Sequence, residues 1–205
     1  LHVRSRRQRQ MCIRDRSLFL VISLAGIFGG CTNYMTQVER GYAVTDARGK
    51  TLHMKEKPKR IVSTYIFADE IILDLVSHDR IAAMDRWIHD PGLSMAVDKA
   101  KDVTVEVDNS PEDIIVLRPD LVVIGESQVK LIQALEGAGL PVFVYKDAKL
   151  IKDIPDEIRM LGEAVGETEK AEAMIADMKD QLRAIEYKVK QIPKEQMQRV
   201  ILILR

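Results

Sequence analysis

Short apolar runs rich in β-branched residues alternate along this chain with segments whose apolar residues recur every three or four positions. The short runs predict β-strands, and the segments with the longer period predict amphipathic helices. Such alternation predicts an α/β fold, in which a mostly parallel sheet has helices on both faces. A hairpin is expected at 42–47 and 50–54, strands at 60–64, 80–84, 103–105, 121–124 and 141–145, and helices at 68–76, 111–117, 128–138 and 151–165.

Several helix boundaries carry their own signals. Ser110 precedes Pro111 and is placed to cap the helix that follows, while Gly166 is placed to end another helix. A much longer helix is then expected at 168–192, with a single apolar stripe and a length of roughly 35 Å at a rise of about 1.5 Å per residue. Such a helix suits either a bridge between two lobes or a coiled-coil contact. The single stripe and Pro193 favour the bridge.

The first 41 residues differ in character from the rest. Residues 1–16 are arginine-rich and are expected to be the basic part of an export signal or a segment foreign to the protein. Residues 17–30 form an apolar run that ends in two glycines before Cys31, and it is shorter than the roughly 20 residues of a spanning helix. This pattern is similar to a lipoprotein signal, which would lipidate Cys31, leave 31–41 as a tether and anchor the exported protein at the cell envelope. The alternative is a secreted protein with a free thiol.

Composition narrows the classes of function. The chain has 46% apolar and 30% charged residues, and 31 basic residues balance 31 acidic ones, so no basic field attracts nucleic acid. The sequence lacks a glycine-rich phosphate loop, a Gly-x-Ser-x-Gly elbow and a His-Glu-x-x-His motif. The four histidines, at positions 2, 53, 78 and 89, lack the spacing of metal ligands. A binding protein without cofactor or covalent chemistry is expected, with an exported α/β enzyme or an adhesion lobe as alternatives.

Six short phrases carry a resemblance to a known family. In this order and at this spacing they resemble the periplasmic binding proteins that deliver iron–siderophore, haem or cobalamin to an ABC importer. The resemblance implies a monomer with an N-terminal α/β lobe over 42–167 and an interlobe helix over 168–192. It also implies that 193–205, with a strand at 199–204, begins a second α/β lobe that is missing from this chain. The phrases lie at 45–50, 57–63, 79–84, 110–115, 118–124 and 139–142.

The candidate ligand contacts follow the predicted strands. In an open parallel sheet, ligands bind outside the carboxyl ends of the strands. Aromatic rings and a guanidinium at this edge suit a large, partly aromatic metal chelate. The tyrosine and the tryptophan could instead fill the core, the arginine and the histidine could be solvated, and the serine is also placed to cap a helix. The candidates are Tyr65, Arg86, Trp87, His89 and Ser127.

Glu112 has two compatible roles. It lies in the first turn of the helix at 111–117, where a carboxylate contributes about 0.3–1 kcal/mol through the helix dipole. The resemblance implies a second role, because a glutamate in the corresponding phrase of the family docks with arginines of the ABC permease. The expected partners are therefore a permease, an iron chelate, haem or corrinoid as ligand, and a membrane reached through the lipid on Cys31.

Overall fold

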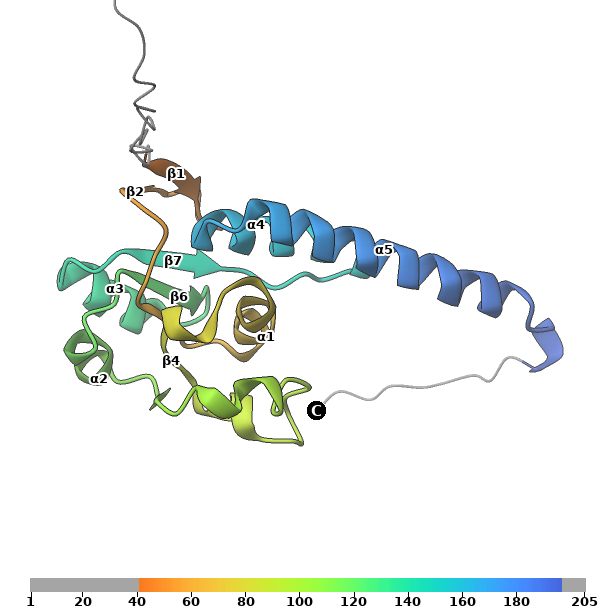
Figure 1. Cartoon of the computed structure of the whole chain (residues 1–205), viewed down its shortest axis with the longest axis horizontal. Coiled ribbons are helices and arrows are strands. Elements are labelled where there is room, and N and C mark those ends of the chain that lie inside the picture. Colours follow the sequence, from red (N-terminus) through yellow and green to blue (C-terminus); the bar gives the residue numbers. More distant parts are fainter. Residues whose placement is uncertain (1–40, 197–205) are drawn as a thin grey trace, which may run out of the picture. The chain divides into compact units, whose positions relative to one another are not determined.

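The computed structural model describes residues 41–196. Helices pack around a central sheet, and one long helix near the C-terminal end of the described chain extends beyond the sheet (Figure 1). The sheet has five parallel strands in the order β5-β4-β3-β6-β7. Four of these strands lie where the sequence predicted them. Their bounds are β3 Ile61–Ser63, β4 Ile81–Asp85, β5 Glu106–Val107, β6 Leu121–Gly125 and β7 Val142–Tyr145.

Helices cover both faces of the sheet, which confirms the predicted α/β class. Successive side chains of a strand point to opposite faces. In β6, Val123 therefore joins the core under α1, α4 and α5, while Val122 and Ile124 join the core under α2 and α3. Burial on both faces explains why the strands are continuous apolar runs in the sequence. The helices are α1 (Ile66–Leu75), α2 (Pro111–Val116), α3 (Val129–Gly137), α4 (Ile154–Val165) and α5 (Thr168–Lys190).

The prediction of a strand at 103–105 is wrong. The strand in this region, β5, pairs with β4 only at Glu106 and Val107. The amide of Val103 donates to the carbonyl of Ala100 at 2.8 Å and closes a turn. This turn takes up the Val103 amide, and the first bond to β4 forms only at Val105, whose carbonyl accepts from the Met84 amide at 3.2 Å.

The helix ends form largely as their residues predicted. The Ser110 hydroxyl accepts a hydrogen bond from the Asp113 amide at 3.4 Å, and Pro111 occupies the first turn of α2. Gly166 ends α4 with a left-handed φ of 74°, a conformation that glycine adopts without steric cost. The start of α4 differs, because a short 3₁₀ helix at Ile151–Asp153 precedes it.

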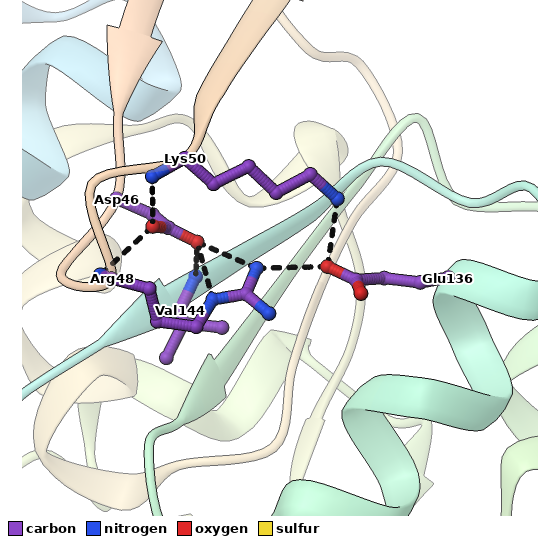
Figure 2. Close-up of polar contacts among 5 residues, drawn as sticks. All are labelled: Asp46, Arg48, Lys50, Glu136 and Val144. Atoms are coloured by element: carbon purple, nitrogen blue, oxygen red, sulfur yellow. Dashed lines mark hydrogen bonds and ion pairs between the residues drawn. The ribbon is translucent and has the colours of Figure 1, made fainter.

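A buried carboxylate holds the predicted hairpin against the sheet. The Asp46 side chain accepts hydrogen bonds from the amides of Arg48, Lys50 and Val144 at 2.9, 3.0 and 3.4 Å (Figure 2). The Arg48 guanidinium and the Lys50 ammonium each donate to Glu136 of α3 at 2.8 Å, and these bonds lower the pKa of Glu136. The network ties the turn of the hairpin to β7 and α3. The hairpin strands are β1 (Tyr42–Thr45) and β2 (Thr51–Met54).

Only the first half of α5 is covered by the rest of the described chain. Ala171 and Ile175 are buried, and Met174 packs partly against the same core. Further along the predicted stripe, Ile185 is 55% exposed and Val189 is 46% exposed. Figure 1 shows that this half of the helix continues past the sheet. The predicted apolar stripe of α5 is therefore present, and no described residue covers its C-terminal end.

Several sequence predictions lie outside the described residues. They concern the segment 1–16, the signal 17–30, lipidation of Cys31, the tether up to residue 40 and the strand at 199–204. Among residues 41–196, no helix combines the length and the apolar character needed to cross a membrane.

Gly162→Ala is expected to lower the free energy of unfolding by about 1–3 kcal/mol, because it overpacks the crossing of α4 and α5. A Cβ at Gly162 would lie 2.3 Å from the Cβ of Ala171, so the helices would have to separate. Urea unfolding measures the change. Gly137→Ala is the matched control: its Cβ meets nothing within 4 Å, and alanine favours helix, so stability should not fall. Equal stability of Gly162→Ala and the wild type would contradict the close crossing.

Candidate ligand-binding site

A groove opens beside the edge of the sheet where the parallel strands end. This edge groove has a volume of about 410 Å³ and lies between α1, the end of β7 and α4. A second groove, of about 420 Å³, lies near Tyr42 and Gly166, where the strands begin. Ligands of open α/β sheets bind at the carboxyl ends of the strands, which selects the edge groove and a groove of about 420 Å³ that adjoins it and shares Asp147, Ala148 and Glu157. The lining residues of the edge groove are Phe67, Glu70, Ile71, Tyr145, Asp147, Ala148, Ile154 and Glu157.

Tyr65 lies two residues after β3 and supports the aromatic side of the edge groove. Its ring centroid lies 5.7 Å from those of Phe67 and Tyr145, and its hydroxyl donates to the Asp147 carboxylate. A Cβ at Gly125 would lie 2.9 Å from the Tyr65 ring, so glycine at the end of β6 makes room for it. Burial, and then the bond to Asp147, raise the pKa of Tyr65, which keeps the phenol protonated. Tyr65 thus packs against the core and also backs the groove.

Glu157 is a groove residue that the sequence did not single out. It lies in the first turn of α4 and is only 9% exposed. Its Oε2 accepts a hydrogen bond from the Tyr145 hydroxyl at 2.9 Å, while its Oε1 is buried without a hydrogen-bond partner in the described chain. Burial raises the pKa of Glu157 despite the Tyr145 bond, and Asp147 and Asp153 raise it further. An acidic residue in a first helical turn usually signals only a favourable helix dipole, so the sequence alone did not mark this burial.

The loop after β4 presents a cation–aromatic pair. Trp87 is 42% exposed, which excludes the core role considered for it. The Arg86 guanidinium lies 4.3 Å from the centroid of the Trp87 ring and pairs with Asp108 at 3.2 Å, so it is not simply a solvated charge. The Nε2 of His89 lies 3.1 Å from the carbonyl oxygen of Val103, which ties this ring to the chain before β5. These three candidates share one loop, but none of them lines the edge groove.

The prediction that Ser127 caps α3 is wrong. The N-cap of α3 is Gln128, and it makes no side-chain cap, while Ser127 is exposed in the preceding turn. The Gln128 amide donates to the carbonyl of Gly125 at 3.1 Å, which delays the first helical turn. The Gln128 side chain accepts from the Thr64 hydroxyl at 3.0 Å and donates to the Thr64 carbonyl at 3.3 Å. Gln128 therefore links the loops that follow β3 and β6.

A fully buried carboxyl, Asp69 of α1, supports the loop that carries Trp87. Its Oδ2 accepts from the Asp85 amide at 3.0 Å, and the Asp85 carboxylate accepts from the Trp87 amide at 2.9 Å. Burial raises the pKa of Asp69 well above its ordinary value, although the neighbouring Ser63 hydroxyl and the Asp85 amide favour the ionised form. The position of the indole thus depends on a carboxyl inside the core.

Glu112 lies on a separate surface, at the start of α2. Its side chain is exposed and accepts a hydrogen bond from the Ser110 hydroxyl at 3.2 Å. Ile115 and Val116 of the same helix are exposed as well. A carboxylate beside exposed apolar side chains is compatible with both roles considered for Glu112.

A parallel α/β unit with a groove at the carboxyl ends of its strands has the architecture of a small-molecule binding domain. The sequence model of the periplasmic binding protein family matches residues 61–204. The chain therefore belongs to the periplasmic binding protein family, as the order of its sequence phrases indicated.

Individual relatives agree with this assignment. The ABC transporter substrate-binding lipoprotein YvrC of Bacillus subtilis (strain 168) is 31% identical over 163 residues, which are 78% of this chain and 51% of YvrC. The heme binding protein HmuT shares the fold with a TM-score of 0.61 at 21% identity, over 75% of this chain and 50% of HmuT. The siderophore binding protein BauB does so with a TM-score of 0.57 at 19% identity, over 75% of this chain and 56% of BauB. The chain spans about half the length of these relatives.

Asp69→Asn is expected to stabilise the protein at neutral pH by about 1–3 kcal/mol, the usual cost of an ill-compensated buried polar group. The folded pKa of Asp69 lies above the unfolded value of 3.8. As the pH rises from that value through the raised pKa, the unfolded chain loses its proton first, so the free energy of unfolding falls. Asparagine stays neutral and keeps an acceptor for the Asp85 amide, which removes this fall.

Urea unfolding between pH 4 and pH 8 measures this difference, which should shrink towards the acid end. The control is Asp79→Asn at an exposed position, which should keep the fall in stability that Asp69 causes. A profile for Asp69→Asn parallel to that of the wild type would contradict the assigned role of Asp69.

Proposed function

We propose that this chain is the ligand-binding part of a substrate-binding lipoprotein of an ABC importer, and that it captures an iron–siderophore, haem or cobalamin. One observation carries the proposal: a member of the periplasmic binding protein family has an aromatic-backed groove at the carboxyl ends of its strands. YvrC is an ABC transporter substrate-binding lipoprotein, HmuT binds heme, and BauB binds a ferric siderophore. The groove volume of about 410 Å³ lies within the range of roughly 300–1,000 Å³ for ligand pockets.

The function is binding and release without covalent chemistry, as the family membership supports. No observation on residues 41–196 favours the alternative of an exported α/β enzyme. We also infer export and anchoring at the cell envelope through a lipidated Cys31, in keeping with the lipoprotein YvrC.

Two groups of ligand contacts support this function. The edge groove, backed by Tyr65, holds one part of the ligand, and the exposed ring of Trp87 with Arg86 stacked on it contacts another part. Ser127 is exposed in the loop after β6 and contributes a hydroxyl at the same edge. His89 acts indirectly, because its bond to the chain before β5 steadies the loop of Trp87.

Binding of a ferric siderophore, haem or cobalamin to the intact protein is expected to quench the fluorescence of Trp87. Such ligands absorb where tryptophan emits, and the indole is exposed in a loop at the proposed site. Fluorescence titration, corrected for absorption by free ligand, measures the effect. Trp87→Phe should remove this signal and leave a calorimetric affinity in the same range. An unquenched Trp87 in a protein that binds the ligand would remove Trp87 from the contact surface.

Glu112→Ala is expected to impair uptake of the ligand by cells and to leave ligand affinity unchanged. Loss of a charge on a docking surface affects encounter and specificity, while the contacts that hold the ligand stay intact. The structural role of Glu112 is small, about 0.3–1 kcal/mol through the helix dipole.

Transport of radiolabelled ligand and calorimetry measure the two effects of Glu112→Ala separately. Glu169→Ala removes an acidic residue from the first turn of α5 instead and is the matched control, with unchanged uptake. Normal uptake by Glu112→Ala would exclude Glu112 from permease docking, and lost affinity with normal docking would assign it to the ligand site.

A further inference from the structure

The charged side chains that line the edge groove are all acidic. They are Glu70, Asp147 and Glu157, and no lysine, arginine or histidine is among the described residues of its lining. The Arg86 guanidinium binds Asp108. Lys146, which lies 3.9 Å from Glu126, and Lys149 line an adjoining groove that shares Asp147 and Glu157. The lining of the edge groove itself is therefore acidic, and lysines lie only at its border.

Hydrogen bonds hold these carboxylates in fixed positions. The Oε1 of Glu70 accepts from the Met95 amide at 2.7 Å and from the Ser94 hydroxyl at 3.2 Å. Asp147 accepts from the Tyr65 hydroxyl, and Glu157 accepts from the Tyr145 hydroxyl at 2.9 Å. Each donor is a neutral group, so these bonds orient the carboxylates and leave their charges uncompensated.

Aromatic and aliphatic surface completes the edge groove. Phe67 and Tyr145 line it, and Tyr65 packs against both rings at centroid distances of 5.7 Å. The faces of aromatic rings carry partial negative charge and attract organic cations. Ile71 and Ile154 supply the remaining apolar contact. Rings and carboxylates together favour a cation that also has apolar surface.

One oxygen of the cluster lacks a partner. Glu157 is only 9% exposed, and its Oε1 has no hydrogen-bond donor within the described chain. Buried polar atoms are nearly always paired, because an unpaired one costs about 1–3 kcal/mol. This buried oxygen belongs to a residue that lines the groove, so a cation bound there would offset the charge of the carboxylate through space, without a direct hydrogen bond.

We propose that the edge groove binds a protonated or quaternary ammonium group of the ligand. The inference rests on the proposed function, since it specifies the charge of the ligand that the same site holds. Among the ligands proposed it favours an amine-bearing siderophore, because haem and cobalamin carry no ammonium group. A carboxylate-bearing or catecholate end of a chelate would meet the negative wall and is excluded from this groove. A bare metal ion fits less well, because no group of three or more His, Cys, Asp or Glu residues within 41–196 could hold one.

Choline and its neutral isostere 3,3-dimethylbutan-1-ol test the inference in the purified intact protein. The two molecules match in shape and differ in charge. Methyl and amide NMR signals of Ile71, Ile154 and Ala148 report binding in the groove. Choline should shift these signals in a saturable manner, and the neutral isostere should bind about tenfold more weakly or not at all, as loss of a desolvated cation–aromatic contact implies.

Variants on α4 separate the groove from general charge effects. Glu157→Gln keeps the shape and an acceptor for Tyr145, and it should weaken choline binding several-fold. Glu163→Gln removes the same charge from an exposed position of α4 outside the groove and should bind choline as the wild type does. If Glu157→Gln loses its native NMR spectrum, Glu70→Gln takes its place, with the same weakening expected.

Several outcomes would overturn the ammonium assignment. They are equal affinity for choline and the neutral isostere, no shift of the three reporter residues, or unchanged choline affinity in the groove variants. A larger effect of magnesium chloride than of choline on the same signals would also overturn it. The proposed function fails separately, in the chelate-binding and uptake assays. A protein that binds chelates but ignores choline keeps its transport role and loses only this assignment.

Discussion

Parallel pairing around β3 is the constraint on which the rest of the structure depends. This strand pairs with β4 on one side and with β6 on the other, and β7 follows beyond β6. Parallel strands require crossover connections, and the crossover helices cover both faces of the sheet. Only the ends of the strands remain for a binding site. The same pairing brings Tyr65, Trp87 and Tyr145 to the carboxyl ends of the strands, although they are far apart in the sequence.

Two buried carboxyls contrast with this apolar frame. Burial raises the pKa values of both Asp69 and Glu157, so each disfavours folding when it is ionised. Natural proteins accept such costs chiefly at functional sites. Glu157 lines the edge groove, and Asp69 supports the loop that carries Trp87. Both costs therefore fall at the edge of the sheet where we propose that the ligand binds.

Patterns governed by neighbouring residues were predictable from the sequence. The cap at Ser110 and the helix end at Gly166 depend on groups within one or two turns, and both are confirmed. Features governed by distant contacts were not predictable. Gln128 displaces Ser127 as N-cap, and its side chain binds Thr64 across the sheet edge. Glu157 enters the candidate site only because α4 packs against β7. The sequence predicted that the site lies at the carboxyl ends of the strands, but it did not predict the acidic lining of the groove.

The network around Asp46 has a consequence for self-association. β7 is an outer strand, and the free amides and carbonyls of outer strands recruit strands from other molecules. Here the Val144 carbonyl receives the Ala47 amide, and the Val144 amide reaches the Asp46 carboxylate. The hairpin turn thus occupies the backbone positions that an incoming strand would need. At the opposite edge, β5 offers only two residues. The described sheet therefore offers little free strand edge for pairing with another molecule, because the hairpin turn covers β7 and β5 is short.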